Sequence, residues 1–189
     1  MTRVLFNLAA SEAGWFACVS GAANGLPWLG PLVVLGLILF HLRLSKRPGP
    51  ETRLILSAVL IGLVADSLLV VTGLVSYPAG TWFEGFAPYW ILAMWALFAT
   101  TLNVSFKWLR GRTILAAVLG AIGGPLAYLA GKELGAITFN EQALALVALA
   151  VIWAVAMPLL MKLAVRMDGM SEAVMPGYIQ PDWRRTNHA

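Results

Sequence analysis

The sequence holds few of the residues that build covalent, haem or metal sites. Its single cysteine, Cys18, excludes an internal disulfide. Its two histidines, His41 and His188, cannot supply both axial ligands of a haem at membrane depth, because His188 lies in the polar tail. The sequence also offers no set of cysteine, histidine and carboxylate ligands suited to zinc. We therefore expect no cofactor and no metal.

Recognisable catalytic motifs are absent as well. The sequence contains no Gly-x-Ser-x-Gly elbow, no phosphate-binding loop and no dinucleotide fingerprint. Serine, histidine and aspartate do not cluster as in a triad, and no lysine lies within an apolar stretch where a retinal-type Schiff base would need it. Chemistry carried by carboxylates alone stays open, but the sequence favours a protein that is not an enzyme.

Charged residues are also scarce, at 12% against 60% apolar residues, with a mean hydropathy of +0.80. A helix crosses the hydrocarbon core with about 20 mainly apolar residues, and six stretches fit, at about 4–23, 26–43, 53–75, 88–108, 112–131 and 142–165. The connections are short. We predict an all-α membrane protein, a single bundle of six transmembrane helices over residues 1–166. An irregular tail follows at 167–189 and packs through Tyr178 and Trp183.

The basic residues set the orientation. All but one of the 13 lysines and arginines fall on one side of the predicted bundle, and only Lys132 falls on the other. Because basic residues near span ends stay in the cytoplasm, we expect both termini to be cytoplasmic in a bacterial inner membrane. The net charge of +4 then reflects contact with anionic lipid headgroups and not with nucleic acid.

The first apolar stretch is the most polar of the six. It carries Asn7, Ser11 and Glu12, so it could instead lie on the membrane surface or be a cleaved signal. A signal peptide needs a continuous apolar region, and Glu12 interrupts it. We favour a span.

Two carboxylates fall inside predicted spans, where a charge costs about 2.5–3.5 kcal/mol and is rarely idle. Asp66 shares a helix face with Gly62 and Gly73 and should point into the bundle. It is either a proton-linked or ligand-binding group or a buried acid bonded to a free backbone carbonyl. Glu12 lies beside Trp15 and is either functional or merely interfacial.

Other candidates lie near breaks and span ends. Pro125 of Gly123-Gly124-Pro125 frees a backbone carbonyl in the fifth span, at about the depth of Asp66, so this break is either a simple bend or part of a pocket. Asn24 lies in the tight turn at 24–28 and tolerates left-handed geometry. Asn103 fits an interhelical contact. His41 fits an interface position at the end of the second span.

Six basic residues should form a patch on the cytoplasmic side. This basic patch comprises Arg43, Lys46, Arg47, Lys107, Arg110 and Arg112. It is either the ordinary anchor expected of a membrane protein or a docking surface for lipid phosphates or an acidic partner.

Five segments resemble a known family. They are residues 14–18 (GWFAC), 21–31 (GAANGLPWLGP), 66–69 (DSLL), 89–103 (YWILAMWALFATTLN) and 123–128 (GGPLAY). Together they resemble a family of small proteobacterial inner-membrane proteins defined as a domain of unknown function. The resemblance implies genes close to those of cyclopropane-fatty-acid-synthase-like enzymes and stress regulators, and hence a role in modifying or protecting membrane lipid. It implies no catalytic residues.

These observations support two functional hypotheses. The first is a non-catalytic lipid-handling protein that holds an acyl chain, interacts with membrane lipids and works beside a cytoplasmic lipid-modifying enzyme. The second is a small proton-coupled transporter or permeation path that uses Asp66 with Glu12, for which a homodimer would be needed.

Overall fold

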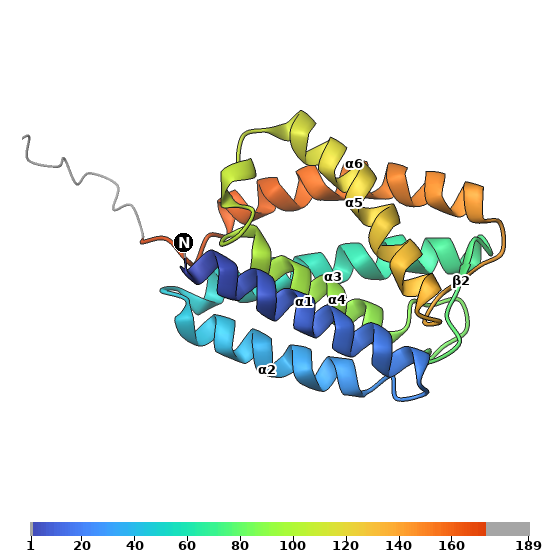
Figure 1. Cartoon of the computed structure of the whole chain (residues 1–189). Coiled ribbons are helices and arrows are strands. Elements are labelled where there is room, and N and C mark those ends of the chain that lie inside the picture. Colours follow the sequence, from blue (N-terminus) through green and yellow to red (C-terminus); the bar gives the residue numbers. More distant parts are fainter. Residues whose placement is uncertain (1, 173–189) are drawn as a thin grey trace, which may run out of the picture.

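The computed structural model describes residues 2–172, which fold almost entirely into helices (Figure 1). The helices are α1 (Thr2–Ala23), α2 (Leu29–Leu44), α3 (Pro48–Val71), α4 (Tyr89–Leu102), α5 (Thr113–Glu133) and α6 (Gln142–Arg166). A short 3-10 helix, η1 (Lys107–Leu109), lies between α4 and α5. The expected all-α architecture is confirmed. The predicted packing of Tyr178 and Trp183 lies outside the described residues.

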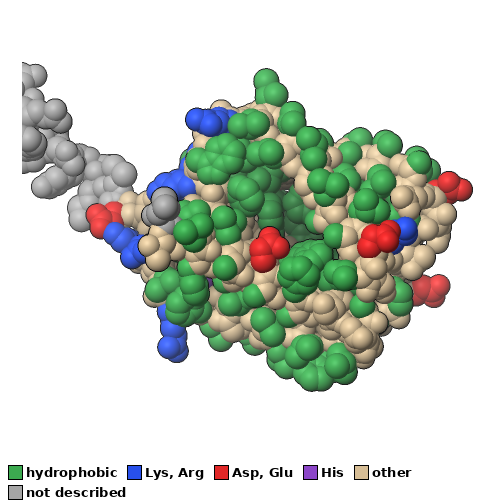
Figure 2. Space-filling model, in the orientation of Figure 1, with side chains coloured by type: hydrophobic (Ala, Val, Ile, Leu, Met, Phe, Trp, Pro, Cys, Tyr) green, Lys and Arg blue, Asp and Glu red, His purple; other side chains and the backbone are tan. Residues whose placement is uncertain are grey.

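The surface of the bundle is strongly apolar. Three helices, α3, α5 and α6, are each long and apolar enough to cross a membrane, while α2 and α4 are apolar but shorter. On α3 alone, Leu56, Leu60, Val64, Leu68 and Val71 are each more than half exposed. Hydrophobic side chains cover much of the molecule in Figure 2. Soluble monomers rarely expose apolar patches of this extent, so the chain is compatible with a membrane protein.

Two helices begin or end away from the expected positions. Helix α3 begins at Pro48, five residues before the expected start at 53, because proline in the first turn of a helix sacrifices no hydrogen bond. Helix α4 ends at Leu102 instead of near 108. There the backbone N–H groups of Val104, Ser105 and Phe106 all bond to the Thr101 carbonyl, which tightens the chain into a turn.

The helices form two groups joined by α3. Helices α1, α2 and α4 pack against one another, and α3 packs mainly on α4. Helix α6 contacts α3 and α4, whereas α5 packs almost solely on α6 and crosses it obliquely (Figure 1). Helix α5 therefore stands apart from α1.

Small residues bring neighbouring helices close together. A Cβ atom at Gly30 of α2 would overlap the backbone of Cys18 in α1. In the same way, Gly120 of α5 faces the backbone of Trp153 in α6, and Gly62 of α3 faces the indole of Trp95 in α4. These contacts follow the small-residue packing common between membrane helices.

The bundle has two chemically different ends. At the end that we call the basic end lie the N-terminus of α1, the α2–α3 and α4–α5 connections and the C-terminus of α6 (Figure 1). Lysine and arginine side chains gather there in Figure 2. At the opposite end, which we call the strand end, β1 (Val75–Ser76) pairs antiparallel with β2 (Thr138–Phe139).

The structure corrects one prediction and defines the turn at 24–28. Gly73 does not share the buried face of α3, since the helix stops at Val71 and Gly73 ends it with φ of +70°. Asn24 does not adopt left-handed geometry. The next residue, Gly25, takes φ of +74°, because a residue without a Cβ atom enters that region at no steric cost.

Candidate functional site

Asp66 is the centre of a buried hydrogen-bond cluster. Its side chain is fully buried, and its Oδ1 accepts hydrogen bonds from the hydroxyls of Tyr77 (2.8 Å) and Tyr128 (2.5 Å). Its Oδ2 accepts a third from Nε1 of Trp95, at 2.7 Å. The Asp66 cluster therefore consists of one carboxylate and three side-chain donors. The alternative expected from the sequence, a single hydrogen bond from Asp66 to a backbone carbonyl, is not what the structure shows.

The cluster ties four elements together. Asp66 belongs to α3, Trp95 to α4 and Tyr128 to α5, while Tyr77 follows β1 at the strand end. Gly62 lies one turn before Asp66, and the absence of a side chain there lets the Trp95 indole lie flat against α3. The carboxylate thus fixes the positions of an indole and a phenol that belong to different helices.

Those two aromatic side chains line a cavity, which we call the aromatic cavity, between α1, α4, α5 and α6. Its volume is about 440 Å³. Its walls include Trp15, Met94, Trp95, Phe98, Phe106, Leu119, Gly123, Gly124, Tyr128, Trp153 and Met157. The Trp95 and Trp153 rings stack at 4.6 Å between centroids, and Phe98 meets the Trp153 ring edge to face at 5.3 Å. Figure 2 shows a hollow with hydrophobic walls and an acidic side chain at its edge.

Two polar groups of the aromatic cavity lack partners within residues 2–172. Glu12 of α1 lines the cavity and makes no hydrogen bond or ion pair there with a described residue. The Nε1 atom of Trp153 is buried and has no acceptor among the described residues. The cavity therefore offers the Glu12 carboxylate and the buried N–H of Trp153 in an otherwise mostly apolar lining.

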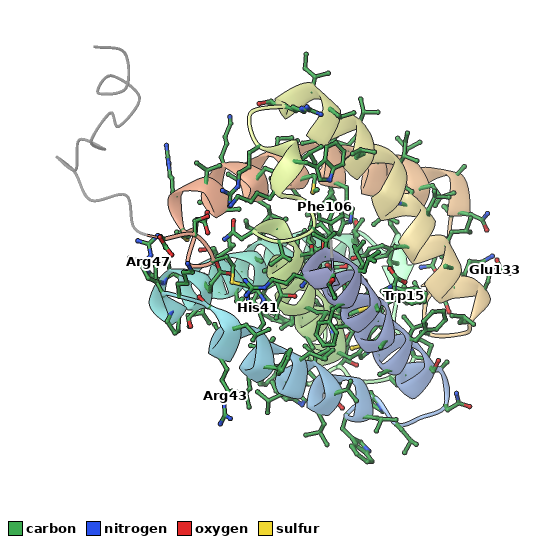
Figure 3. All side chains as sticks on the ribbon, turned by 60° about the vertical axis from the view of Figure 1, so that its left-hand side comes forward. Trp15, His41, Arg43, Arg47, Phe106 and Glu133 are labelled. Carbon is green, nitrogen blue, oxygen red and sulfur yellow. The ribbon has the colours of Figure 1, made fainter. Side chains whose placement is uncertain are left out.

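A second buried carboxylate, Glu51, occupies the basic end. It is fully buried in the first turn of α3, and its Oε2 lies 2.8 Å from Nε2 of His41. Its Oε1 accepts hydrogen bonds from the Asn103 side chain (2.7 Å) and from the backbone N–H of Gly169 (2.8 Å). In Figure 3, His41 lies inside the bundle, whereas Arg43 points away from it.

The Glu51 cluster continues into an ion pair. The side-chain oxygen Oδ1 of Asn103 accepts a hydrogen bond from Arg110, which also pairs with Asp168 at 2.9 Å. Burial raises the pKa of Asp168, but hydrogen bonds from Ser171 and Arg110 outweigh it and lower that pKa from 3.8 to about 2. Asp168 is therefore ionised throughout the physiological pH range and holds the segment 167–172 against the bundle.

Much of the basic patch is already engaged by this segment. Arg110 pairs with Asp168, Arg47 donates to the Asp168 carbonyl, Lys46 pairs with Glu172, and Lys107 donates to the hydroxyl of Ser171. Of the other two members, Arg112 lies over the Trp108 ring and Arg43 is exposed. Within residues 2–172, two members of the patch thus pair with carboxylates of the chain itself, and two more donate to neutral oxygens of the same segment.

A second cavity, which we call the cationic cavity, lies between α1, α2 and the chain that follows α4. Its volume is about 540 Å³. Its polar lining includes Arg3, Asn7, His41, Asn103 and Lys107, and its apolar lining includes Phe6, Leu37, Phe40, Leu44 and Leu97. Within residues 2–172, no aspartate or glutamate lines it.

The predicted site residues therefore do not form a single site. Glu12, Gly123 and Gly124 line the aromatic cavity, whereas Asn103 belongs to the Glu51 cluster and the cationic cavity. Pro125 lies inside α5, and the Asn24 side chain, near the strand end, bonds to no group of residues 2–172 other than the Ser20 carbonyl. Asp66 lines neither cavity, and none of its three hydrogen bonds involves Glu12.

Sequence reasoning missed Glu51 and the aromatic donors to Asp66. Glu51 precedes the buried face of α3, with helical spacing to Ile55, Ala58, Gly62 and Asp66. That spacing was a usable signal, because residues three and four apart share one helix face. Within the described residues, no group of three or more potential metal ligands comes together.

Comparison with known proteins identifies the family. The family described as "Protein of unknown function (DUF2878)" matches residues 4–159. The chain belongs to this family. The range matched to DUF2878 includes the Asp66 cluster and the whole lining of the aromatic cavity, but it ends before Asp168. No curated protein and no solved structure matches the chain.

Proposed function

We propose that this DUF2878 protein is a six-span inner-membrane protein, with both termini in the cytoplasm, that binds a membrane lipid without acting as an enzyme. One acyl chain of the lipid occupies the aromatic cavity. The protein thereby presents or protects lipid during membrane fatty-acid modification or stress.

The aromatic cavity carries this proposal. Its volume of about 440 Å³ falls within the range of about 300–1,000 Å³ that ligand pockets have. It lies between the apolar helices α4, α5 and α6, of which α5 is held almost solely by α6. In a bilayer the surrounding medium is hydrocarbon, so an acyl chain is the occupant that such walls favour.

Positioning of the walls also supports a dedicated site. Asp66 anchors both Trp95 and Tyr128 through hydrogen bonds, and the stacked Trp153 extends the same wall. A cluster of fully satisfied buried polar groups rigidifies its surroundings. The unpartnered Nε1 of Trp153 can donate to a carbonyl or hydroxyl of the bound lipid.

Photo-crosslinking with a diazirine-labelled phospholipid tests the proposal in membranes that contain the full chain. A Cβ atom at Gly123 would meet nothing within 4 Å, so Gly123→Leu adds a bulky side chain to the cavity wall without a clash at its Cβ atom. Gly36 of α2 is equally open but lies outside both cavities, which makes Gly36→Leu the matched control. Both changes remove a helical glycine and gain a similar helix propensity.

We expect cross-links on cavity residues such as Phe98 and Met157 in the native chain and in Gly36→Leu, and their loss in Gly123→Leu. Cross-links spread evenly over the exposed apolar faces, unchanged by Gly123→Leu, would reject the proposal. Membrane fatty-acid profiles of a deletion strain, complemented with the native chain or with Gly123→Leu, would then connect the site to lipid composition.

Proton-coupled transport is the second candidate, favoured by the presence of Asp66 on the apolar helix α3 and of a second carboxylate, Glu12, on α1. Against it stands the enclosure of Asp66, which is fully buried and lines neither cavity. Asp66→Asn separates the two functions. A transporter would lose its coupling to pH, whereas a lipid-binding protein would keep its cross-links with lower stability.

A further inference from the structure

The cationic cavity differs from the aromatic cavity in its chemistry and in its place. Helix α1 separates the two, since its neighbouring residues Ser11 and Glu12 line the cationic and the aromatic cavity respectively. The cationic cavity lies at the basic end, where the chain termini and the basic connections gather. An occupant of one cavity therefore need not be the occupant of the other.

The charge of this cavity is unbalanced. Arg3 lines it and has no ion-pair partner within the described residues, and Lys107 donates only to the neutral hydroxyl of Ser171. Elsewhere at this end, Arg110 and Lys46 each pair with a carboxylate. The cationic groups of the cavity thus remain available to an anion, while their neighbours are already neutralised.

The His41 side chain adds a third polar group that can bind an anion. Nε2 of His41 lies 2.8 Å from the Glu51 carboxylate, which leaves Nδ1 for a further hydrogen bond. Asn7 is also a lining residue, and its amide nitrogen donates to the Thr100 carbonyl at 3.2 Å. Hydrogen-bonding groups therefore accompany the two cations.

The remaining lining is apolar. Phe6 of α1 and Phe40 of α2 approach to 5.5 Å between ring centroids, and Leu37, Leu44 and Leu97 also line the cavity. A small inorganic anion would make no favourable contact with these apolar walls. A molecule that joins a phosphate to hydrocarbon matches both parts of the lining.

We infer that the cationic cavity is a binding site for an anionic glycerophospholipid, with the phosphate between Arg3 and Lys107 and the start of an acyl chain against Phe6 and Phe40. The site is distinct from the aromatic cavity and does not depend on the function proposed for it. It would give the protein a preference for anionic over zwitterionic lipid.

Native mass spectrometry of the full chain in a non-ionic detergent tests this inference. The probes are phosphatidylglycerol, phosphatidylcholine with the same chains, and inorganic phosphate. Arg3→Gln/Lys107→Gln removes the cations, and both residues are exposed, so the variant should fold. Arg43→Gln is the matched control, because Arg43 is exposed on α2 at the same end but does not line the cavity (Figure 3).

We expect the native chain and Arg43→Gln to retain phosphatidylglycerol in preference to phosphatidylcholine. Each basic residue near a lipid headgroup contributes about 1 kcal/mol, so the double variant should bind phosphatidylglycerol about 30-fold more weakly. Inorganic phosphate should not displace the lipid at comparable concentrations.

Three results of the mass spectrometry would overturn the inference. They are equal retention of the two lipids, displacement by inorganic phosphate, and equal losses in Arg43→Gln and the double variant. Gly123→Leu keeps the two sites apart experimentally, because it should abolish cross-links in the aromatic cavity and leave phosphatidylglycerol retention unchanged. Loss of both signals in one variant would show a single site, which also contradicts the inference.

Discussion

Replacing Asp66 tests whether one carboxylate holds α3, α4 and α5 together. Asp66→Ala removes the acceptor of three buried donors, on Tyr77, Trp95 and Tyr128. A buried donor left without a partner costs about 1–3 kcal/mol, so even the low end gives a loss of about 3 kcal/mol in the free energy of unfolding.

Asp66→Asn should cost much less. An asparagine can keep its carbonyl oxygen where Oδ1 accepts from both tyrosines, and it then turns its amide nitrogen toward the indole nitrogen of Trp95. Two donors retain an acceptor and one loses it, so we expect a loss of about 1 kcal/mol.

Unfolding in mixed dodecyl maltoside and SDS micelles, followed by far-UV circular dichroism, measures both variants. Val64→Ala is the control, since Val64 lies on the same helix with 71% of its surface exposed and should change stability by less than about 0.5 kcal/mol. Equal losses in Asp66→Ala and Asp66→Asn would refute the reasoning, because the count of satisfied donors would then not determine stability.

Three further predictions follow from the same structure. Gly120→Ala should destabilise α5 against α6, because its Cβ would overlap a backbone carbonyl, whereas Gly123→Ala should gain up to about 1 kcal/mol of helix propensity in the same unfolding assay. Glu51→Gln should weaken the anchor of the Gly169 amide and speed its hydrogen exchange, and unchanged protection would contradict the role given to that carboxylate. The pKa of Asp168 is lowered in the folded chain, so the stability that its ionised form contributes is present above its ordinary pKa of 3.8. That stability is lost as the pH falls toward about 2. Proteolysis of the C-terminal segment should accelerate over that range in the native chain, and Asp168→Asn should be cleaved at a rate that changes little with pH.

Hydropathy and charge predicted much of the architecture. Apolar stretches between turn residues located the six α-helices of residues 2–172, though not η1, and the single-sided distribution of basic residues anticipated one basic end. Asp66 could be singled out because a carboxylate within an apolar run is costly unless it is satisfied. Its partners could not be predicted, since Tyr77, Trp95 and Tyr128 lie 11, 29 and 62 residues away on other elements.

Glu51 was missed for a local reason. The third span was expected to begin at about 53, after Glu51, and the segment Pro48-Gly49-Pro50 has the composition of a loop. Proline is tolerated in the first helical turn, where backbone N–H groups have no partner inside the helix, and α3 therefore starts at Pro48. That extension carries Glu51 onto the buried face.

The number and position of basic residues in the sequence could not predict the partners of the basic patch. Its members were expected to face lipid or a partner protein, but residues 168–172 pack against Arg47, Arg110 and Lys107. The sequence marks this segment as polar and irregular, without any indication of where it packs. Only the fold brings Asp168 to Arg110, 58 residues earlier in the chain.

The placement of the two buried carboxylates on α3 explains how an apolar helix tolerates both. They share one face, and the opposite face is the exposed row that includes Leu60 and Val64. Glu51 lies in the first turn, where the helix dipole favours a negative charge, and Asp66 lies five residues before the last residue, Val71, or about 7.5 Å along the axis. Each carboxylate is therefore near an end of the helix, within reach of partners from the connections: Gly169 for Glu51 and Tyr77 for Asp66. The centre of α3 remains apolar. The cost of desolvating each carboxylate is offset near an end of the helix, where polar partners lie within hydrogen-bond distance.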